Sequence, residues 1–114
     1  YASMEIEIGD LEKLEIKVGK VIDVKPFLNA KKPAYKLWID FGESGVRKSS
    51  AQITKLYKME ELIGRKIIAV TNLPPKQIAD FMSEVLVLGV ETKEGVILLK
   101  LDRDISEGVK IKYL

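Results

Sequence analysis

Apolar and polar residues alternate along much of the chain, and a period of two is the pattern of strands with one buried face. In residues 15–24 four even positions are apolar, namely Ile16, Val18, Ile22 and Val24. We therefore predict a half-buried strand there. Gly19 in its middle predicts a bulge or a sharp bend, because a residue without a Cβ tolerates backbone conformations that other residues avoid.

Further strands follow after a loop at residues 26–33. Residues 35–41 alternate cleanly and lead through a glycine-containing turn at 42–45 into residues 46–53, so these two segments should pair as a hairpin. Beyond them we predict a loop at residues 74–82, a tight turn at 93–95, and strands at residues 65–73, 84–92, 96–101 and 109–114.

Two short helices interrupt these strands. Asp10 begins a capped helical turn through Leu14, and a second helix at residues 58–64 ends at Gly64. A helix after the third strand is the order of the OB-fold, a five-stranded Greek-key barrel with a short helix between strands 3 and 4. We therefore predict a mostly-β OB-fold barrel with added terminal strands, although an unrelated small barrel or sandwich would fit the same pattern.

The length of the chain indicates one domain. A chain of 114 residues can bury one core but not two, so we expect a single domain over residues 4–114. Tyr1-Ala2-Ser3 precedes Met4 and reads as a cloning remnant, which we leave out of the fold prediction.

The run Val85-Leu86-Val87-Leu88-Gly89-Val90 does not alternate. One face of an antiparallel sheet usually meets water, so a strand that is apolar on both faces needs a second cover. Another part of this chain could supply it, but a second subunit is the better candidate. We predict a two-fold homodimer that buries the chain ends and part of this strand, with interface residues Val85, Val87, Leu88 and Val90.

The chain contains no cysteine and no histidine. These absences remove disulfides, thiolate nucleophiles, imidazole bases and the usual zinc ligands. We therefore expect no enzyme activity, no metal and no cofactor. No apolar run approaches the ~20 residues of a membrane-spanning helix, and the N-terminus lacks the features of a secretory signal. We expect a cytoplasmic protein without membrane insertion.

Basic residues concentrate in the middle of the chain. The formal net charge is only +2, yet residues 31–76 carry ten basic and four acidic side chains. Such a distribution suits a protein that presents one cationic face to an anionic or mixed partner. Lysines scattered along solvated strand edges would give the same count.

Four segments together resemble the CsaA family. They are Val18-Gly19-Lys20-Val21, NAKKPAYKLWIDFG at residues 29–42, RKSSAQI at residues 47–53 and NLPPKQIADFMSEVLVLG at residues 72–89. CsaA proteins are small homodimers within the wider tRNA-binding domain family, whose OB-fold module also occurs in methionyl- and phenylalanyl-tRNA synthetases and in EMAP II. The resemblance therefore implies an OB-fold homodimer.

Two functions follow from the resemblance. CsaA proteins are export-related chaperones that hold unfolded preproteins, with the secretion machinery as a further partner, whereas the parent domain binds tRNA in a structure-specific way. No glycine-rich phosphate loop precedes a helix in this chain, so any chaperone activity would be independent of ATP. A structural or regulatory subunit with neither activity is the third alternative.

Three side chains are candidates for contact with a polypeptide. Phe81 and Met82 pair an aromatic with a flexible thioether, which suits varied apolar segments, although both could instead cap the barrel end. Trp38 is out of phase with Leu37 and Ile39, so it should face away from their core. An outward tryptophan lines either a binding surface or the dimer interface.

Basic and polar residues would surround this contact. We expect a rim that attracts carboxylates or phosphates, made of Lys32, Lys36, Arg47, Lys48 and Lys76. The resemblance matches Arg47, Ser49, Asn72 and Ser83 to positions that contribute to the tRNA surface of the parent family. The serines could instead be small residues where strands pack closely, and Asn72 could stabilise the turn before Pro74.

Two departures from the tRNA-binding modules favour polypeptide over tRNA. Lys32-Pro33 replaces a His-Pro pair, as it does in CsaA proteins, and Asp80 stands where both groups usually carry glycine. Aspartate tolerates a left-handed backbone better than most residues. Its charge should weaken phosphate binding unless Lys76 pairs with it.

Overall fold

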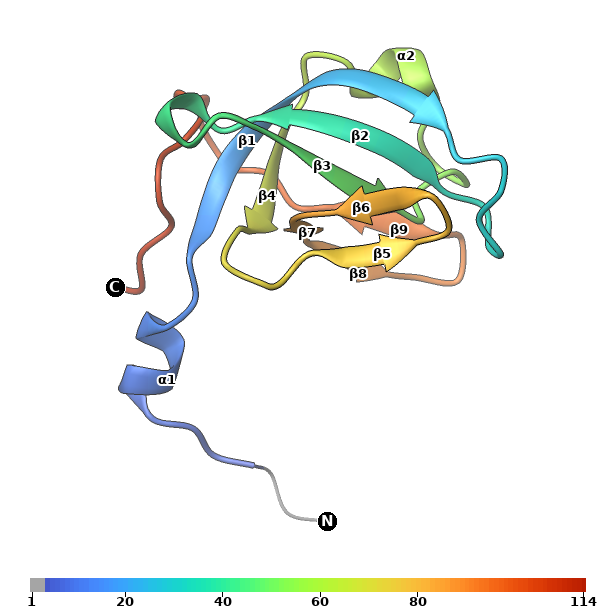
Figure 1. Cartoon of the computed structure of the whole chain (residues 1–114). Coiled ribbons are helices and arrows are strands. Elements are labelled where there is room, and N and C mark those ends of the chain that lie inside the picture. Colours follow the sequence, from blue (N-terminus) through green and yellow to red (C-terminus); the bar gives the residue numbers. More distant parts are fainter. Residues whose placement is uncertain (1–3) are drawn as a thin grey trace.

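One curled antiparallel sheet forms the body of the structure, a computed structural model that describes residues 4–114 (Figure 1). The predicted cloning remnant, residues 1–3, lies outside the described residues. The strand order is β3-β2-β1-β4-β7, with bounds β1 Ile16–Pro26, β2 Tyr35–Asp40, β3 Val46–Ala51, β4 Lys66–Val70 and β7 Leu86–Val87. The edge strands β3 and β7 contact each other, so the sheet is a nearly closed barrel. This confirms the predicted OB-fold class.

Short helices and two hairpins complete the fold. The helices are α1 Ile8–Glu12, the 3₁₀ turn η1 Gly42–Ser44 and α2 Met59–Leu62. Helix α2 lies between β3 and β4, as predicted. The hairpins are β5 Lys76–Ile78 with β6 Phe81–Ser83, and β8 Gly89–Glu91 with β9 Val96–Leu98.

Strand β1 holds the sheet together because it pairs with two neighbours. Its first half, from Ile16 to Lys20, pairs with β4, and its second half continues to Pro26 along β2. The free side of the first half binds the C-terminal segment, where the Val18 N–H donates to Val109 O at 3.0 Å. Each part of this long strand therefore closes a different part of the barrel.

Several predicted boundaries are wrong. Residues 74–82 are not a loop but contain most of the β5–β6 hairpin, and residues 84–92 break into β7 and β8. Residues 109–114 form only an isolated bridge, between Lys110 and Lys17, beside backbone hydrogen bonds that join Val109 and Ile111 to β1. Asp10 does not begin α1: it lies inside the helix and accepts a hydrogen bond from the Glu7 N–H at 3.1 Å.

Gly19 is required for close packing rather than for a bulge. A Cβ at this position would lie 2.6 Å from Phe41 Cε1 and even closer to Ile39 Cγ2. The irregularity in the pairing of β1 with β2 lies between Val21 and Asp23 instead. The bulge, one of the two alternatives predicted at Gly19, was therefore misplaced, because the glycine lets Ile39 of β2 and Phe41 directly after it approach the β1 backbone.

Two apolar clusters fill the molecule. The larger one is the barrel interior, and its fully buried members include Val21, Leu37, Ile39, Phe41, Leu62 and Ile67. The smaller one consists of Phe27, Ala34 and Phe81, with Ala30, Trp38 and Ile78 packed against it. It joins the loop that follows β1 to the β5–β6 hairpin, outside the barrel interior. No helix in the described part of the chain is long and apolar enough to cross a membrane.

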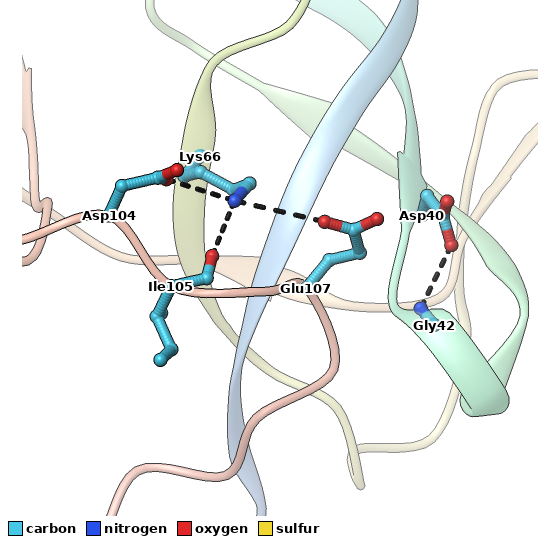
Figure 2. A network of polar contacts seen from close by, with 6 residues as sticks. All are labelled: Asp40, Gly42, Lys66, Asp104, Ile105 and Glu107. Atoms are coloured by element: carbon cyan, nitrogen blue, oxygen red, sulfur yellow. Dashed lines mark hydrogen bonds and ion pairs between the residues drawn. The ribbon is translucent and has the colours of Figure 1, made fainter.

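Lys66 anchors the C-terminal segment to β4 (Figure 2). Its ammonium lies 3.0 Å from Asp104 Oδ1 and 3.8 Å from Glu107 Oε2, and it also donates to the Ile105 carbonyl. The hydrogen bond from Lys66, and then its charge, lower the pKa of the Asp104 carboxyl below its ordinary value of 3.8. The charged form of Asp104 is therefore favoured in the folded protein.

We expect Asp104→Asn to flatten the acid limb of the stability profile. A carboxyl whose pKa is lowered by folding adds stability above its unfolded pKa, and this stability disappears as the pH falls through the lowered folded value. Measured by urea unfolding, the free energy of unfolding of the wild type should fall more between pH 6 and pH 3 than that of the variant. A Lys66→Gln background should remove the difference. An equal loss in wild type and Asp104→Asn would contradict the assignment.

Candidate ligand-binding surface

Three aromatic rings meet between β2, β6 and the loop after β1. The centroids of Phe27 and Phe81 are 5.5 Å apart, and those of Trp38 and Phe81 are 5.9 Å apart, both in edge-to-face geometry. Trp38 belongs to this cluster while Leu37 and Ile39 are fully buried in the barrel core. The alternation of β2 therefore places Trp38 on the opposite face of the strand, as expected.

Three lysines lie over these rings. Lys36 Nζ is 4.8 Å from the centroid of Phe27 and 5.3 Å from that of Phe81. Lys48 Nζ is 5.2 Å from the Phe81 centroid, and Lys25 Nζ is 5.3 Å from that of Trp38. An ammonium at this distance is attracted by the ring quadrupole. Within residues 4–114 none of the three ammonium groups has an ion-pair or hydrogen-bond partner.

Accessibility divides the predicted peptide contacts. Phe81 is only 5% exposed, so it supports the surface from below and cannot itself receive a ligand. This corrects the expectation of an accessible Phe81 on a loop, since the residue begins β6. Met82 is 39% exposed and Trp38 is partly buried, so these two remain on the surface.

The predicted basic rim surrounds the rings unevenly. Lys76 is exposed on β5, opposite Ser83 in the hairpin. Lys32 is exposed in the loop before β2, where it lines a cavity with Gln52. Arg47 is half-buried, and its Nη1 donates to Thr71 O at 3.4 Å. Lys36 and Lys48 are therefore the members of the rim that lie directly over the aromatic cluster.

Ser49 and Ser83 belong to the seam that closes the barrel. Ser49 is fully buried, and its Oγ is 3.1 Å from the Val85 carbonyl. Ser83 Oγ accepts from the Ser50 N–H at 3.0 Å, and Glu84 Oε1 accepts from the Lys48 N–H at 2.9 Å. Side chains thus replace part of the backbone ladder between β3 and residues 83–85. Ser49 is not available to a ligand, so its prediction as a polar contact was wrong.

Asn72 ties the end of β4 to the segment before β1. Its Oδ1 accepts from the Glu15 N–H at 2.9 Å, and its Nδ2 donates to the Lys13 carbonyl at 2.6 Å. Both ends of the amide are therefore used, and neither bond stabilises the turn before Pro74. The position that the resemblance matched to a tRNA contact has an internal structural role here.

The predicted dimer residues divide between two environments. Val85 is 5% exposed and belongs to the barrel core, and Val87 packs against that core. The expectation that Val85 is covered by a partner is therefore wrong, because the protein's own barrel covers it. On the outward side Leu86 is 51% and Val90 is 52% exposed, and Leu88 is partly buried.

Asp80 lies in the turn between β5 and β6, beside the cluster. The residue with the left-handed backbone is Ala79, at φ 53°, and not Asp80 as predicted. Asn29 Nδ2 donates to Asp80 Oδ1 at 3.1 Å. This hydrogen bond is the main cause that lowers the pKa of the Asp80 carboxyl, and the charge of Lys36 adds to it. Asn29 and Lys36, rather than Lys76, are the side chains that act on the Asp80 carboxyl.

Sequence reasoning missed Phe27, Lys25 and Asn29. All three lie at the end of β1 or in the loop that follows, where the alternating pattern stops. Only the isolated aromatic between Pro26 and Leu28 could have drawn attention to this loop. Among residues 4–114 no group of three or more acidic side chains is placed to hold a metal ion.

Comparison with known proteins gives a consistent result. A family model described as "Putative tRNA binding domain" matches residues 16–110. The methionine–tRNA ligase of Methanocaldococcus jannaschii is 37% identical over 109 residues, which is 95% of this chain but 16% of the ligase, so the chain spans about one-sixth of that relative.

Two solved structures match over their whole lengths. The CsaA chaperone protein from Picrophilus torridus is 54% identical, with a TM-score of 0.91, and the match covers 95% of this chain and 100% of that one. The chaperone CsaA from Bacillus anthracis is 45% identical, with a TM-score of 0.90, and the match covers 96% of this chain and 100% of that one.

We expect Ser49→Ala to weaken the barrel without altering the ligand surface. The change leaves the buried Val85 carbonyl without this donor, which should cost about 1–3 kcal/mol of unfolding free energy. Urea denaturation measures the loss, and Ser106→Ala, an exposed serine, is the matched control. Ligand affinity per folded molecule should stay unchanged, and a selective loss of affinity at full stability would contradict the structural role.

Proposed function

Because the chain belongs to the tRNA-binding domain family, we propose that it acts as a CsaA-like chaperone that holds unfolded preprotein segments without ATP. One observation carries the proposal: accessible apolar groups and unpartnered cations share one surface. Trp38 is the apolar group beside the cations Lys36 and Lys48, within the described residues, and Met82 is 39% exposed next to Phe81 on β6. Unfolded segments present apolar side chains and carboxylates together, so they complement such a surface.

The proposed binding is passive and adaptable. Met82 has a flexible thioether, which can fit differently shaped apolar side chains. Phe27 and Phe81 lie beneath the lysines and keep the ammonium groups near the surface. Each contact is small and partly exposed, so a single site binds weakly and releases its client readily. Two sites in a dimer would raise the apparent affinity.

tRNA is the second candidate ligand, and the free lysine charges are the observation that favours it. Ammonium groups without carboxylate partners attract phosphates as well as carboxylates. Phe27 and Phe81 are 4% and 5% exposed, so bases cannot stack on these rings. tRNA would therefore bind mainly through its backbone, which positions a nucleic acid without reading its sequence, with the partly buried Trp38 as an accessible ring for stacking.

We also propose a homodimer, which would cover apolar surface that the subunit leaves open. Leu86 and Val90 are about half exposed on the outward side of their strands. A second apolar region lies between the chain ends, where Leu11, Leu14 and Tyr113 line a cavity of about 540 Å³. A two-fold partner could bury both regions, since symmetric dimers use the same patch twice.

A cytoplasmic location is part of the proposal. Preproteins are unfolded before export, so a protein that holds them and passes them to the secretion machinery must meet them on the cytoplasmic side. The CsaA likeness supports this placement, and fractionation of cells tests it.

We expect Met82→Gln to weaken chaperone activity selectively. Loss of one half-exposed apolar contact should cost about 1 kcal/mol, or roughly fivefold in the concentration that halves the aggregation of a denatured client. Light scattering measures this, and Ile63→Gln, at a 55% exposed residue after α2, is the control.

A wild type that retains tRNA but never protects a client would replace the proposal with the second candidate. In that case Lys48→Gln should reduce the slope of the logarithm of tRNA affinity against the logarithm of salt concentration by about one unit.

We expect Val90→Asp to separate the proposed dimer. A charge buried against an apolar partner surface is unfavourable, so the variant should sediment as a monomer at about 10 µM while the wild type remains a dimer. Leu28→Asp, at an 89% exposed residue, introduces the same charge elsewhere and should leave the dimer intact. A wild type that is monomeric at that concentration would rule the dimer out.

A further inference from the structure

Asp80 brings a negative charge to an otherwise cationic surface. The residue directly precedes Phe81, and the Phe81 ring lies under both Lys36 and Lys48. Lys36 is close enough for its charge to act on the Asp80 carboxyl. The same lysines have no ion-pair partner within 4.0 Å among residues 4–114. Asp80 is therefore near the free cations without neutralising them by direct contact.

Asn29 determines where this charge lies. Its Nδ2 donates to Asp80 Oδ1 at 3.1 Å and links the loop after β1 to the β5–β6 turn. Ala79 precedes Asp80 with a positive φ of 53°, a conformation that non-glycine residues rarely adopt. The turn conformation and the hydrogen bond together hold the carboxylate on the rim of the aromatic cluster.

We propose that Asp80, positioned by Asn29, is the specificity-determining residue that biases this surface against polyanions and toward polypeptides. The inference rests on the proposed function, in that it assigns a ligand preference to the same surface. The Asp80 carboxylate offsets part of the attraction between Lys36 and an incoming phosphate. It also repels the neighbouring phosphates of a nucleic acid backbone.

The two ligand classes respond differently to a fixed negative charge. A nucleic acid carries a charge at every phosphate, so it cannot approach Lys36 without bringing further charges toward Asp80. An extended polypeptide can place an apolar or neutral residue there and experience no repulsion. Asp80 is solvent-exposed and Lys36 is half-buried beside it, so the penalty corresponds to a modest factor, about two- to fivefold in affinity. Salt should reduce it, because the screening length falls to about 3 Å at 1 M.

Asp80→Asn separates charge from structure. An asparagine can still accept the hydrogen bond from Asn29 through its side-chain oxygen, so the tie between loop and turn is retained while the charge is lost. Asp102→Asn is the matched control: it makes the same change in net charge at a fully exposed side chain in the C-terminal segment. Asn29→Ala keeps the Asp80 charge but removes the hydrogen bond that positions it.

The experiment compares these variants with two probes and one column. The probes are a fluorescein-labelled tRNA transcript and a fluorescein-labelled extended apolar peptide without charged side chains, and the column is immobilised heparin. At 50 mM salt Asp80→Asn should bind tRNA about two- to fivefold more tightly than the wild type and Asp102→Asn. It should also elute from heparin at higher salt, while peptide affinity stays unchanged. Asn29→Ala should give a smaller gain of the same sign.

The outcomes distinguish this inference from the proposed function. If Asp80→Asn behaves like Asp102→Asn toward both tRNA and heparin, or if it strengthens peptide binding equally, Asp80 does not determine specificity. If the wild type binds no peptide, the proposed function fails, yet the heparin shift still supports or overturns the role of Asp80. A gain that persists at 1 M salt would also overturn it, because the effect is electrostatic.

Discussion

The fold depends on how the barrel closes between β3 and residues 83–85. Side chains replace part of the regular ladder there: Ser49, Ser83 and Glu84 make hydrogen bonds to the backbone of the facing segment, beside backbone bonds from Glu84 and Val85 to the Lys48 carbonyl. This seam has a direct consequence for the ligand surface. Phe81 lies two residues before Ser83, so the closure of the barrel fixes the ring over which Lys36 and Lys48 are held. The ring beneath the two lysines therefore belongs to the segment that closes the barrel.

Much of the fold could be predicted from sequence because β1 and β2 alternate clearly, a glycine-containing turn leads from β2 to β3, and Gly64 closely follows α2. The β5–β6 hairpin was missed because three-residue strands after Pro74-Pro75 are too short to show a period. The strand predicted at residues 109–114 is the opposite case, in which a clear pattern is present without a regular strand. Residues 109–112 alternate well, but their backbone bonds to β1 amount to an isolated bridge, so alternation alone did not determine a regular strand.

The surface was less predictable than the fold, since residue type does not reveal depth. Trp38, Lys36 and Lys48 could be placed from the phase of β2 and from the charge pattern. Burial of Ser49 and of Phe81 depends on contacts between distant segments, which no local pattern records. The pairing of Asn29 with Asp80 is of the same kind, because each residue lies in a loop and acquires its role only when the two loops meet.

Trp38, in edge-to-face contact with Phe81, is an intrinsic fluorescence probe of the candidate surface. Trp38 is the only tryptophan in the sequence, and it lies half-buried beside the Lys25 ammonium. Indole emission depends on nearby charge and on contact with water. The intrinsic fluorescence of the unlabelled chain therefore comes from the candidate surface, where an arriving ligand would change its colour or intensity.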